Sequence, residues 1–254
     1  MKILVISDIH SNIWALEAIL NIEHDYDLIC CAGDFVDYGT APDKVINWAI
    51  KQKNAYFVQG NHDLLTVKEW YKGEYKTITS SCYKWVHHNC ERLNESHIDF
   101  LKNLPRCMRF EADNITYTLQ HQYDHQYGII QSRYEFNHFW QHQIPIAADE
   151  QLYQKERCLI FGHTHRQGCY MLEDQMRWLN PGSISYRRPD DPDKTAHYAI
   201  ITDGKLSLKR AVYNSTPLLN EAKRFYKEKN MLETELQDFF FFFGSAATTR
   251  DPLV

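Results

Sequence analysis

The sequence has no long apolar run and no regular spacing of cysteines. Its five consecutive phenylalanines, Phe239 to Phe243, are too few to cross a bilayer, which takes roughly 20 apolar residues in a helix. The apolar run from Ile3 to Ile6 is ended by Asp8 and His10, too early for a signal peptide. The seven cysteines are an odd number and fit no zinc-ribbon spacing. We therefore expect reduced thiols, no membrane segment and a cytoplasmic location.

Positive charge is also scarce. The 254 residues carry a formal net charge of −5, whereas a nucleic-acid-binding protein usually presents a basic face or stripe. The chain therefore has no strong nucleic-acid signature. Hydrophobic residues make up 44% of it, which is enough for a sizeable core, and its length fits one large α/β domain better than two small ones.

Short apolar segments and helical patterns alternate at the start of the chain. Three strands are expected at 2–7, 28–31 and 55–58, separated by helices near 13–20 and 42–51. The first segment does not alternate between apolar and polar residues, as expected of a strand buried on both faces. Strands that alternate with helices favour a mainly parallel sheet, in which ligands bind at the carboxyl ends of the strands. The polar loops after the three strands should therefore face one crevice.

The rest of the sequence predicts an insertion, a second set of strands and a helical tail. Residues 64–104 have a helical, aromatic pattern and are expected to form a helical insertion or cap. Residues 214–243 show near-helical apolar spacing, and 244–254 are expected to be a disordered tail. Five phenylalanines cannot all lie on one helix face, so some should contact a partner subunit in a homo-oligomer or remain exposed. Further strands are expected at 108–111, 115–119, 158–161, 168–172, 176–179, 198–202 and 206–212.

Five clusters of polar residues lie at the ends of expected strands. In the first, Asp8 and His10 stand two positions apart and would project to the same side of an extended strand end. Taken alone, each cluster has a simpler explanation as a helix cap, a surface group or a satisfied core histidine. Five clusters in order favour a shared metal site. They are Asp8-Ile9-His10, Gly33-Asp34, Gly60-Asn61-His62-Asp63, His121 and Gly162-His163-Thr164-His165.

This series resembles the calcineurin-like metallophosphoesterase superfamily, whose motifs run Asp-x-His, Gly-Asp, Gly-Asn-His-Asp/Glu, His and Gly-His-x-His. The resemblance covers residues 1–213 and implies one metallophosphoesterase domain, an α/β fold built as a two-sheet αββα sandwich. The turn Asn180-Pro181-Gly182-Ser183 is similar to the small bacterial branch, which includes phosphodiesterases and diadenosine polyphosphate hydrolases. The implied substrates are phosphodiesters or nucleotides with phosphoanhydride links.

The resemblance also implies two divalent metal ions, for which manganese, iron, zinc and nickel all suit the ligands. Asp34 would bridge the two ions, and a hydroxide held between them would attack the phosphorus in line. His125 is a rival to His121 as a ligand, because the usual His-Gly of the fourth motif is His121-Gln122 here. One ion would be held by Asp8, His10, Asp34 and His165, and the other by Asp34, Asn61, His121 and His163.

The remaining roles implied by the resemblance concern the substrate. His62 would be the general acid that protonates the leaving oxygen, and Asp37 would orient it, although Asp37 could instead merely cap the nearby helix. Asn12 is assigned to substrate binding. Arg187 and Arg188 could bind a second phosphate or form a solvated pair in a polar loop.

Two alternatives to a phosphodiesterase remain open. Family members that act on phosphoproteins carry Arg after the aspartate that matches Asp37, whereas this chain has Tyr38, so a phosphate clamp is missing. This difference counts against a protein phosphatase, and a phosphomonoesterase is the broader enzyme alternative. The other alternative is a non-catalytic scaffold of the same fold, as in a retromer subunit. The presence of His62 and of a full ligand set argues against the scaffold.

Overall fold

The computed structural model describes the chain except for residues 123–129, 131, 144–155, 174, 186–193 and 245–254. Arg187, Arg188, the rival ligand His125 and the expected tail after Gly244 lie outside the described residues. Each expected strand is present, with ends that differ by a few residues at most. Short apolar runs bounded by polar loops were therefore a reliable strand signal in this chain.

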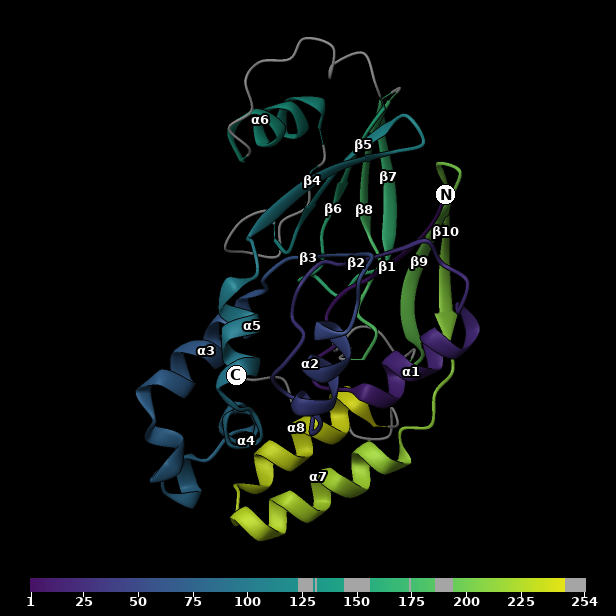
Figure 1. Ribbon diagram of the computed structural model, residues 1–254. Coiled ribbons are helices and arrows are strands. Elements are labelled where there is room, and N and C mark those ends of the chain that lie inside the picture. The colour runs from purple at the N-terminus through teal and green to yellow at the C-terminus, as the bar shows by residue number, and fades with distance from the viewer. Residues whose placement is uncertain (123–129, 131, 144–155, 174, 186–193, 245–254) are drawn as a thin grey trace.

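The strands form two five-stranded mixed sheets (Figure 1). In the first sheet, which has the order β10-β9-β1-β2-β3, β1, β2 and β3 are parallel, and β9 runs antiparallel to its neighbours β1 and β10. In the second sheet β5, β6 and β8 are parallel, in the order β4-β5-β6-β8-β7. The strands are β1 Lys2–Ile6, β2 Leu28–Cys31, β3 Ala55–Phe57, β4 Cys107–Ala112, β5 Ile115–Gln120, β6 Glu156–Ile160, β7 Gly168–Glu173, β8 Met176–Asn180, β9 Ala196–Thr202 and β10 Lys205–Ala211.

The two sheets pack face to face, and helices cover the outer face of each sheet. Alternate residues of β1 serve the two sides: Ile3 and Val5 belong to the core between the sheets, whereas Leu4 and Ile6 pack under the helices. The helices are α1 Ile13–Ile22, α2 Pro42–Ile50, α3 Asn61–Lys72, α4 Trp85–Arg92, α5 Glu95–Asn103, α6 Arg133–Gln143, α7 Thr216–Lys229 and α8 Glu233–Phe243, with short 3-10 turns η1 Glu74–Lys76 and η2 Ser80–Cys82.

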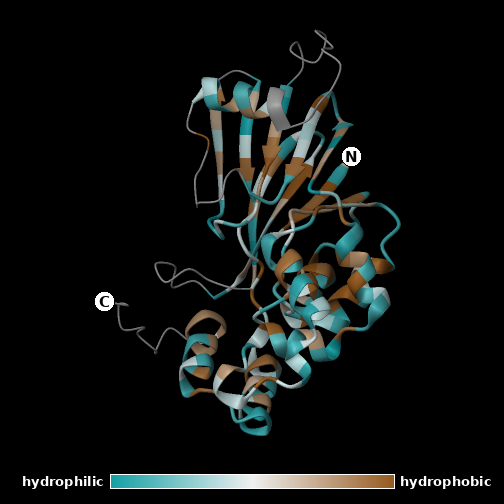
Figure 2. Ribbon diagram, turned by 90° about the vertical axis from the view of Figure 1, so that its left-hand side faces the viewer, coloured by the Kyte–Doolittle hydropathy of each residue, from teal (hydrophilic) through white to brown (hydrophobic). Residues whose placement is uncertain are grey.

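Helix α6 covers the outer face of the second sheet, where Phe136 and Trp140 pack with Leu159 and Trp178. The first sheet is covered by α1, α2 and α5, through residues such as Leu16, Ile46 and Leu101. This layering confirms the expected αββα sandwich. Figure 2 shows hydrophobic colouring concentrated along the strands, while the helices carry hydrophobic and hydrophilic positions together.

The helices α3, α4, α5, α7 and α8 gather at one end of the two sheets (Figure 1). There α8 packs against α7 and α4 in a separate apolar cluster that contains Trp85, Leu218 and Phe225. Phe239, Phe242 and Phe243 are buried in this cluster, and Phe240 and Phe241 are half-buried.

The partial exposure of Phe240 and Phe241 agrees with the expectation that the five phenylalanines cannot all be buried on one helix face. The chain covers α8 from more than one side, since Lys223 lies over the Phe240 ring and Lys194 over the Phe241 ring. The chain itself therefore buries three of the five rings and partly covers the other two, and a homo-oligomer stays a prediction. None of the described helices has the length and apolar character that crossing a bilayer requires.

Candidate metal centre

The loop after β1 brings Asp8 and His10 together in a way that differs from the expected one. Strand β1 ends at Ile6, and both residues have positive φ, 55° for Asp8 and 45° for His10. The expectation of an extended strand end was therefore wrong. The side chains still converge, with His10 Nε2 at 3.9 Å from Asp8 Oδ1, because left-handed residues turn the chain sharply.

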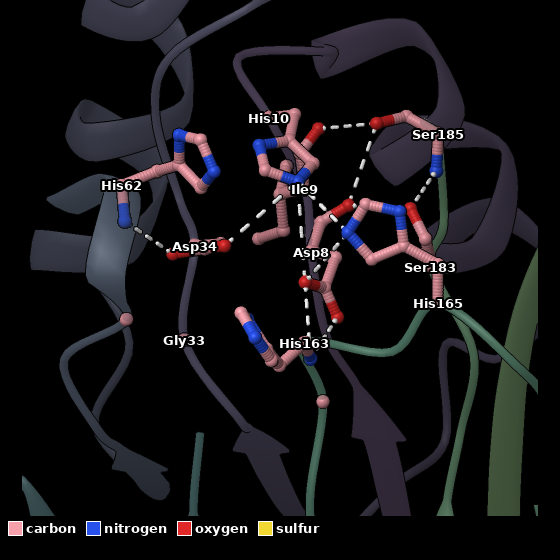
Figure 3. Close-up of polar contacts among 12 residues, drawn as sticks. Asp8, Ile9, His10, Gly33, Asp34, His62, His163, His165, Ser183 and Ser185 are labelled. Carbon is pink, nitrogen blue, oxygen red and sulfur yellow. Dashed lines mark hydrogen bonds and ion pairs between the residues drawn. The ribbon is translucent and has the colours of Figure 1, made fainter. Parts of the chain in front are cut away.

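Two serines from the loop after β8 hold this turn. The Ser183 hydroxyl donates to the Asp8 carbonyl at 2.9 Å, and the Ser185 hydroxyl donates to the Ile9 carbonyl at 2.7 Å. Both serines are buried and stand beside the turn in Figure 3. They stabilise a backbone conformation that non-glycine residues seldom adopt.

The left-handed conformation recurs through the site. Five of the seven expected metal ligands have positive φ: Asp8, His10, Asp34, His163 and His165. A non-glycine residue in this region is strained unless its surroundings hold it there, and such strain clusters at functional sites. The concentration of strained residues at the strand ends is independent support for a site at this rim.

Asp34 lies where two loops press against each other. Gly33 has a φ of 91°, and a Cβ at Gly60 would come within 2.0 Å of Asp34 Oδ1. Both positions therefore require glycine for a physical reason. Asp34 Oδ1 accepts from the His62 backbone N–H at 2.9 Å. The other oxygen, Oδ2, is buried without a well-formed hydrogen bond among the described residues, although His121 Nε2 lies 3.2 Å away.

Asp63 organises the loop that carries Asp34. Its carboxylate accepts backbone N–H groups of Asp34 at 3.0 Å, Phe35 at 2.8 Å, Val36 at 3.2 Å and Gly60 at 2.9 Å. Burial and the neighbouring Asp34 carboxylate raise the pKa of Asp63 to about 7, against the stabilising effect of those donors. Asp63 thus fixes the second and third clusters relative to each other.

The third cluster is the start of a helix, not a loop. Gly60 is the N-cap of α3, so Asn61 and His62 stand in its first turn. Asn61 Oδ1 lies 2.9 Å from both His121 Nε2 and His163 Nδ1. A helix N-terminus presents free N–H groups, and one of them, from His62, already binds Asp34.

The histidines of the later clusters have defined orientations. The His121 Nδ1–H donates to the Ala32 carbonyl at 2.6 Å, which leaves Nε2 directed at Asp34 and Asn61. A hydrogen bond from the far ring nitrogen to a backbone carbonyl is what orients a histidine that binds a metal. His165 Nε2 lies 3.1 Å from Asp8 Oδ1 and 3.3 Å from His10 Nε2. Figure 3 shows His10, His163 and His165 around the Asp8 carboxylate.

These side chains fit divalent cations. Two groups have ligand atoms within 4.8 Å of one another, Asp8 with His10 and His165, and Asp8 with Asp34 and His121. Asp34 also borders the first group, since its Oδ2 lies 3.9 Å from His10 Nε2. Carboxylate oxygens and imidazole nitrogens suit manganese, iron, zinc and nickel. Buried carboxylates and convergent nitrogens are the donor set that a cation would satisfy.

The electrostatics of the rim favour charged carboxylates at Asp8 and Asp34, neutral imidazoles at His10 and His163, and a protonated imidazole at His121. Burial alone would raise the pKa of Asp8 and Asp34, but neighbouring histidines outweigh it and hold both values below the usual range. Burial lowers the pKa of His10 to about 3 and that of His163 to about 4. Burial also opposes the charge on His121, but Asp34 raises its pKa to about 9. Neutral imidazole and ionised carboxylate are the forms that bind metals.

His62 lies at the edge of this rim, in contact with His10 at 5.2 Å between ring centroids and on the side away from His165 (Figure 3). Its Nδ1–H donates to Asp37 Oδ2 at 2.8 Å, and Tyr38 packs on its ring with centroids 4.6 Å apart. Burial lowers the pKa of His62, but the carboxylates of Asp34 and Asp37 outweigh it and raise the value to about 9. The pairing with Asp37 leaves Nε2 as the nitrogen that can exchange a proton.

The loop of Asp37 is held by a residue that sequence reasoning missed. Asn89 on α4 accepts from the Ser11 hydroxyl at 2.5 Å and from the Asp37 N–H at 3.0 Å, and donates to the Gly39 and Trp85 carbonyls at 2.9 Å. Asn89 and Ser185 and the roles of Ser183 and Asp63 escaped notice because most of their partners are backbone groups of distant segments. The available signals were Asp63 in the third motif and Ser183 in the turn that resembles the small bacterial branch.

Asn12 occupies a structural position. It is fully buried and caps α1, where its side chain accepts from the Ala15 N–H at 3.2 Å and donates to the Tyr213 hydroxyl at 3.2 Å. Asn12 is therefore the N-cap of α1. Because both ends of its amide are engaged within the fold, we leave Asn12 out of the substrate site proposed below.

A family model for the calcineurin-like phosphoesterase superfamily domain matches residues 1–203. The chain belongs to that superfamily, as its fold and its five motifs indicated. Phosphoester hydrolysis that depends on divalent metal ions is the chemistry of this family, so the chain is assigned to the hydrolases.

Individual relatives share sequence or fold with most of the chain. An uncharacterized protein of Methanocaldococcus jannaschii is 28% identical over 233 residues, which cover 84% of this chain and 88% of the relative. A metallophosphoesterase of Sphaerobacter thermophilus is 22% identical and has a TM-score of 0.67 over 94% of this chain and 98% of its own. A hypothetical protein of Pyrococcus horikoshii is 17% identical, with a TM-score of 0.70 over 96% and 98%. At these identities the two structures show the shared fold.

Proposed function

We propose that the chain is a phosphodiesterase that uses two divalent cations and the His62–Asp37 pair. The observation that carries the proposal is the convergence of five strand-end clusters on one rim, with His62 at its edge and outside both groups of candidate ligands. One cation would be held by Asp8, His10, Asp34 and His165, and the other by Asp34, Asn61, His121 and His163. When bound, such cations would activate a water molecule and offset the negative charge of the phosphate.

The chain's own residues would complete the chemistry. Asp34 would be shared between the two cations, a role supported by the distances of its Oδ2 from His10 Nε2, 3.9 Å, and from His121 Nε2, 3.2 Å. The His62 Nε2–H would donate its proton to the leaving oxygen as the bond between that oxygen and phosphorus breaks. Asp37 would hold the ring through Nδ1. The pKa of about 9 keeps His62 protonated near neutral pH, and cations beside Asp34 would lower this value because they neutralise the carboxylate that raises it.

The substrate class rests on the branch of the family and on Tyr38. A solved structure titled a putative diadenosine tetraphosphatase is 18% identical with a TM-score of 0.52 over 84% of this chain and 95% of its own, which shows a common fold only. Tyr38 stands against His62 where phosphoprotein phosphatases of the family carry Arg. We therefore favour diesters or nucleotide anhydrides over phosphoproteins.

The test compares a diester with a monoester. Protein stripped with a chelator and then given Mn²⁺ should hydrolyse bis(p-nitrophenyl) phosphate with a higher kcat/KM than p-nitrophenyl phosphate. Elemental analysis should find about two equivalents of metal per chain. Turnover of the monoester alone would support the phosphomonoesterase alternative. Absence of metal-dependent turnover with either ester would leave the scaffold as the better description.

A further inference from the structure

A pocket of about 410 Å³ adjoins His62 on the side of the C-terminal helices. Its walls come from three places: His62 and Asp37 at the metal rim, Lys84 and Trp85 at the start of α4, and Glu235 and Phe242 on α8. The size falls at the lower end of about 300 to 1,000 Å³ for small-molecule sites. It is enough for one ring system with a sugar-sized group.

The position of the pocket relates it to the leaving group. The proton of a general acid goes to the leaving oxygen, so the leaving group must lie on the side of His62. His62 and Asp37 both line the pocket. The opposite wall, α8, lies beyond residue 203, where the family match ends. The pocket therefore joins the family's common rim to a segment outside the matched domain.

The walls of the pocket combine aromatic rings with negative charge. Trp85 and Phe239 have ring centroids 4.6 Å apart, and Phe239 and Phe243 are stacked at 4.6 Å. Asp37, Glu235 and Asp238 contribute three carboxylates to the lining, against Lys84 and the protonated His62. Aromatic walls attract a planar ring, carboxylates accept hydrogen bonds from amino and imino groups, and the charge balance repels an added phosphate.

We propose that this pocket receives the leaving group and selects a nucleoside, an uncharged aromatic alcohol, over a leaving group that carries its own phosphate. The inference rests on the proposed function, because it takes His62 as the proton donor. In the reaction, water oxygen bonds to phosphorus and the bond from phosphorus to the nucleoside oxygen breaks. The leaving oxygen takes the His62 proton, and the proton lost by water restores it. The products are a phosphomonoester and a neutral nucleoside.

The experiment changes the charge of the pocket and compares two substrates. A dinucleoside monophosphate releases a nucleoside, and a dinucleoside diphosphate releases a nucleotide. We compare kcat/KM for the dinucleoside diphosphate with kcat/KM for the dinucleoside monophosphate. In Glu235→Lys this ratio should rise about tenfold over wild type, because the charge at position 235 changes by two units several ångströms from the phosphate of the leaving nucleotide. Glu235→Gln should raise it about threefold, which keeps the test valid where the lysine variant fails to fold. The rise should shrink with added salt.

Glu233→Lys is the matched control, because Glu233 is an exposed residue of the same helix and the charge change is identical. It should leave the ratio within about twofold of wild type, as screened surface charges do. An equal rise of the ratio in Glu233→Lys, or no rise in the Glu235 variants, would overturn the pocket assignment. Hydrolysis of bis(p-nitrophenyl) phosphate by the wild-type protein would still support the proposed function in that case. Faster wild-type cleavage of glycerophosphocholine than of the dinucleoside monophosphate would also overturn it, since a cation fits aromatic and acidic walls as well.

Discussion

The rim of the sheets and the helical wall beside it are built by different means. At the rim, side chains are buried and held by backbone contacts, as when Asp63 accepts four N–H groups from two loops. At the wall, α4 and α8 present aromatic and acidic side chains to an open pocket and are fixed mainly by apolar packing. The rim has little freedom to vary without loss of the ligand geometry, whereas the wall can change charge and shape while its helices stay in place.

This difference suggests that the two regions have different roles. The strand ends would supply the chemistry, and the helical wall would supply the choice of leaving group. Substitutions at the rim should then affect every substrate, and substitutions at the wall should affect substrates unequally. Three predictions test the rim side of the comparison, and the charge changes at Glu235 test the wall.

The largest effect is expected from Asp34→Asn. Asp34 borders both groups of candidate ligands, so loss of its charge should release metal from both sites and reduce activity at least about a thousandfold, since metal ions contribute several kcal/mol of stabilisation to the transition state. Asn61→Ala should chiefly weaken one site. Elemental analysis of the purified variants measures both outcomes.

Asp99→Asn is a matched control, because Asp99 is exposed on α5 and undergoes the same chemical change. It should keep its metal and its activity. If Asp34→Asn retained the full metal content of wild type, the shared role of Asp34 would be wrong.

A smaller and more selective effect is expected from His62→Ala. General acid catalysis contributes about 10²- to 10⁴-fold, so a diester with a poor alkoxide leaving group should be cleaved more slowly by that factor. A nitrophenolate leaving group needs little protonation, so the loss of activity on a nitrophenyl diester should be much smaller. Metal content should be unchanged, since His62 is not one of the proposed ligands and its Nδ1–H pairs with Asp37.

His138→Ala removes an exposed histidine from α6 and should change neither rate. Equal losses on the two substrates in His62→Ala would point to phosphate binding by His62 instead of proton transfer. Loss of metal together with activity would point to a ligand role.

The strands and the rim were predictable because they depend on local patterns. Apolar runs such as Ile3 to Ile6 can be buried on both faces only in an inner strand, and polar residues after parallel strands must meet at one edge. The left-handed turn at Asp8 and His10 was not predictable, because Ser183 and Ser185 hold it from more than 170 positions away. The pocket depends on packing between α4 and α8, which no local pattern specifies.

The smallest effect among the rim substitutions is expected from Asp63→Asn, which tests whether backbone support sets the ligand geometry. The amide keeps one carbonyl oxygen but replaces the other acceptor with an NH₂ group, which would face backbone N–H groups of Asp34 and Gly60 or of Phe35 and Val36. Outer-shell substitutions of this kind typically weaken metal binding about 10- to 100-fold. Asp63 touches no substrate, so kcat at saturating metal should recover most of the wild-type value, unlike in His62→Ala. Metal titrations followed by activity and by calorimetry measure the shift. An unchanged metal affinity, or a reduced kcat that excess metal does not restore, would show that Asp63 does not determine the geometry of the rim.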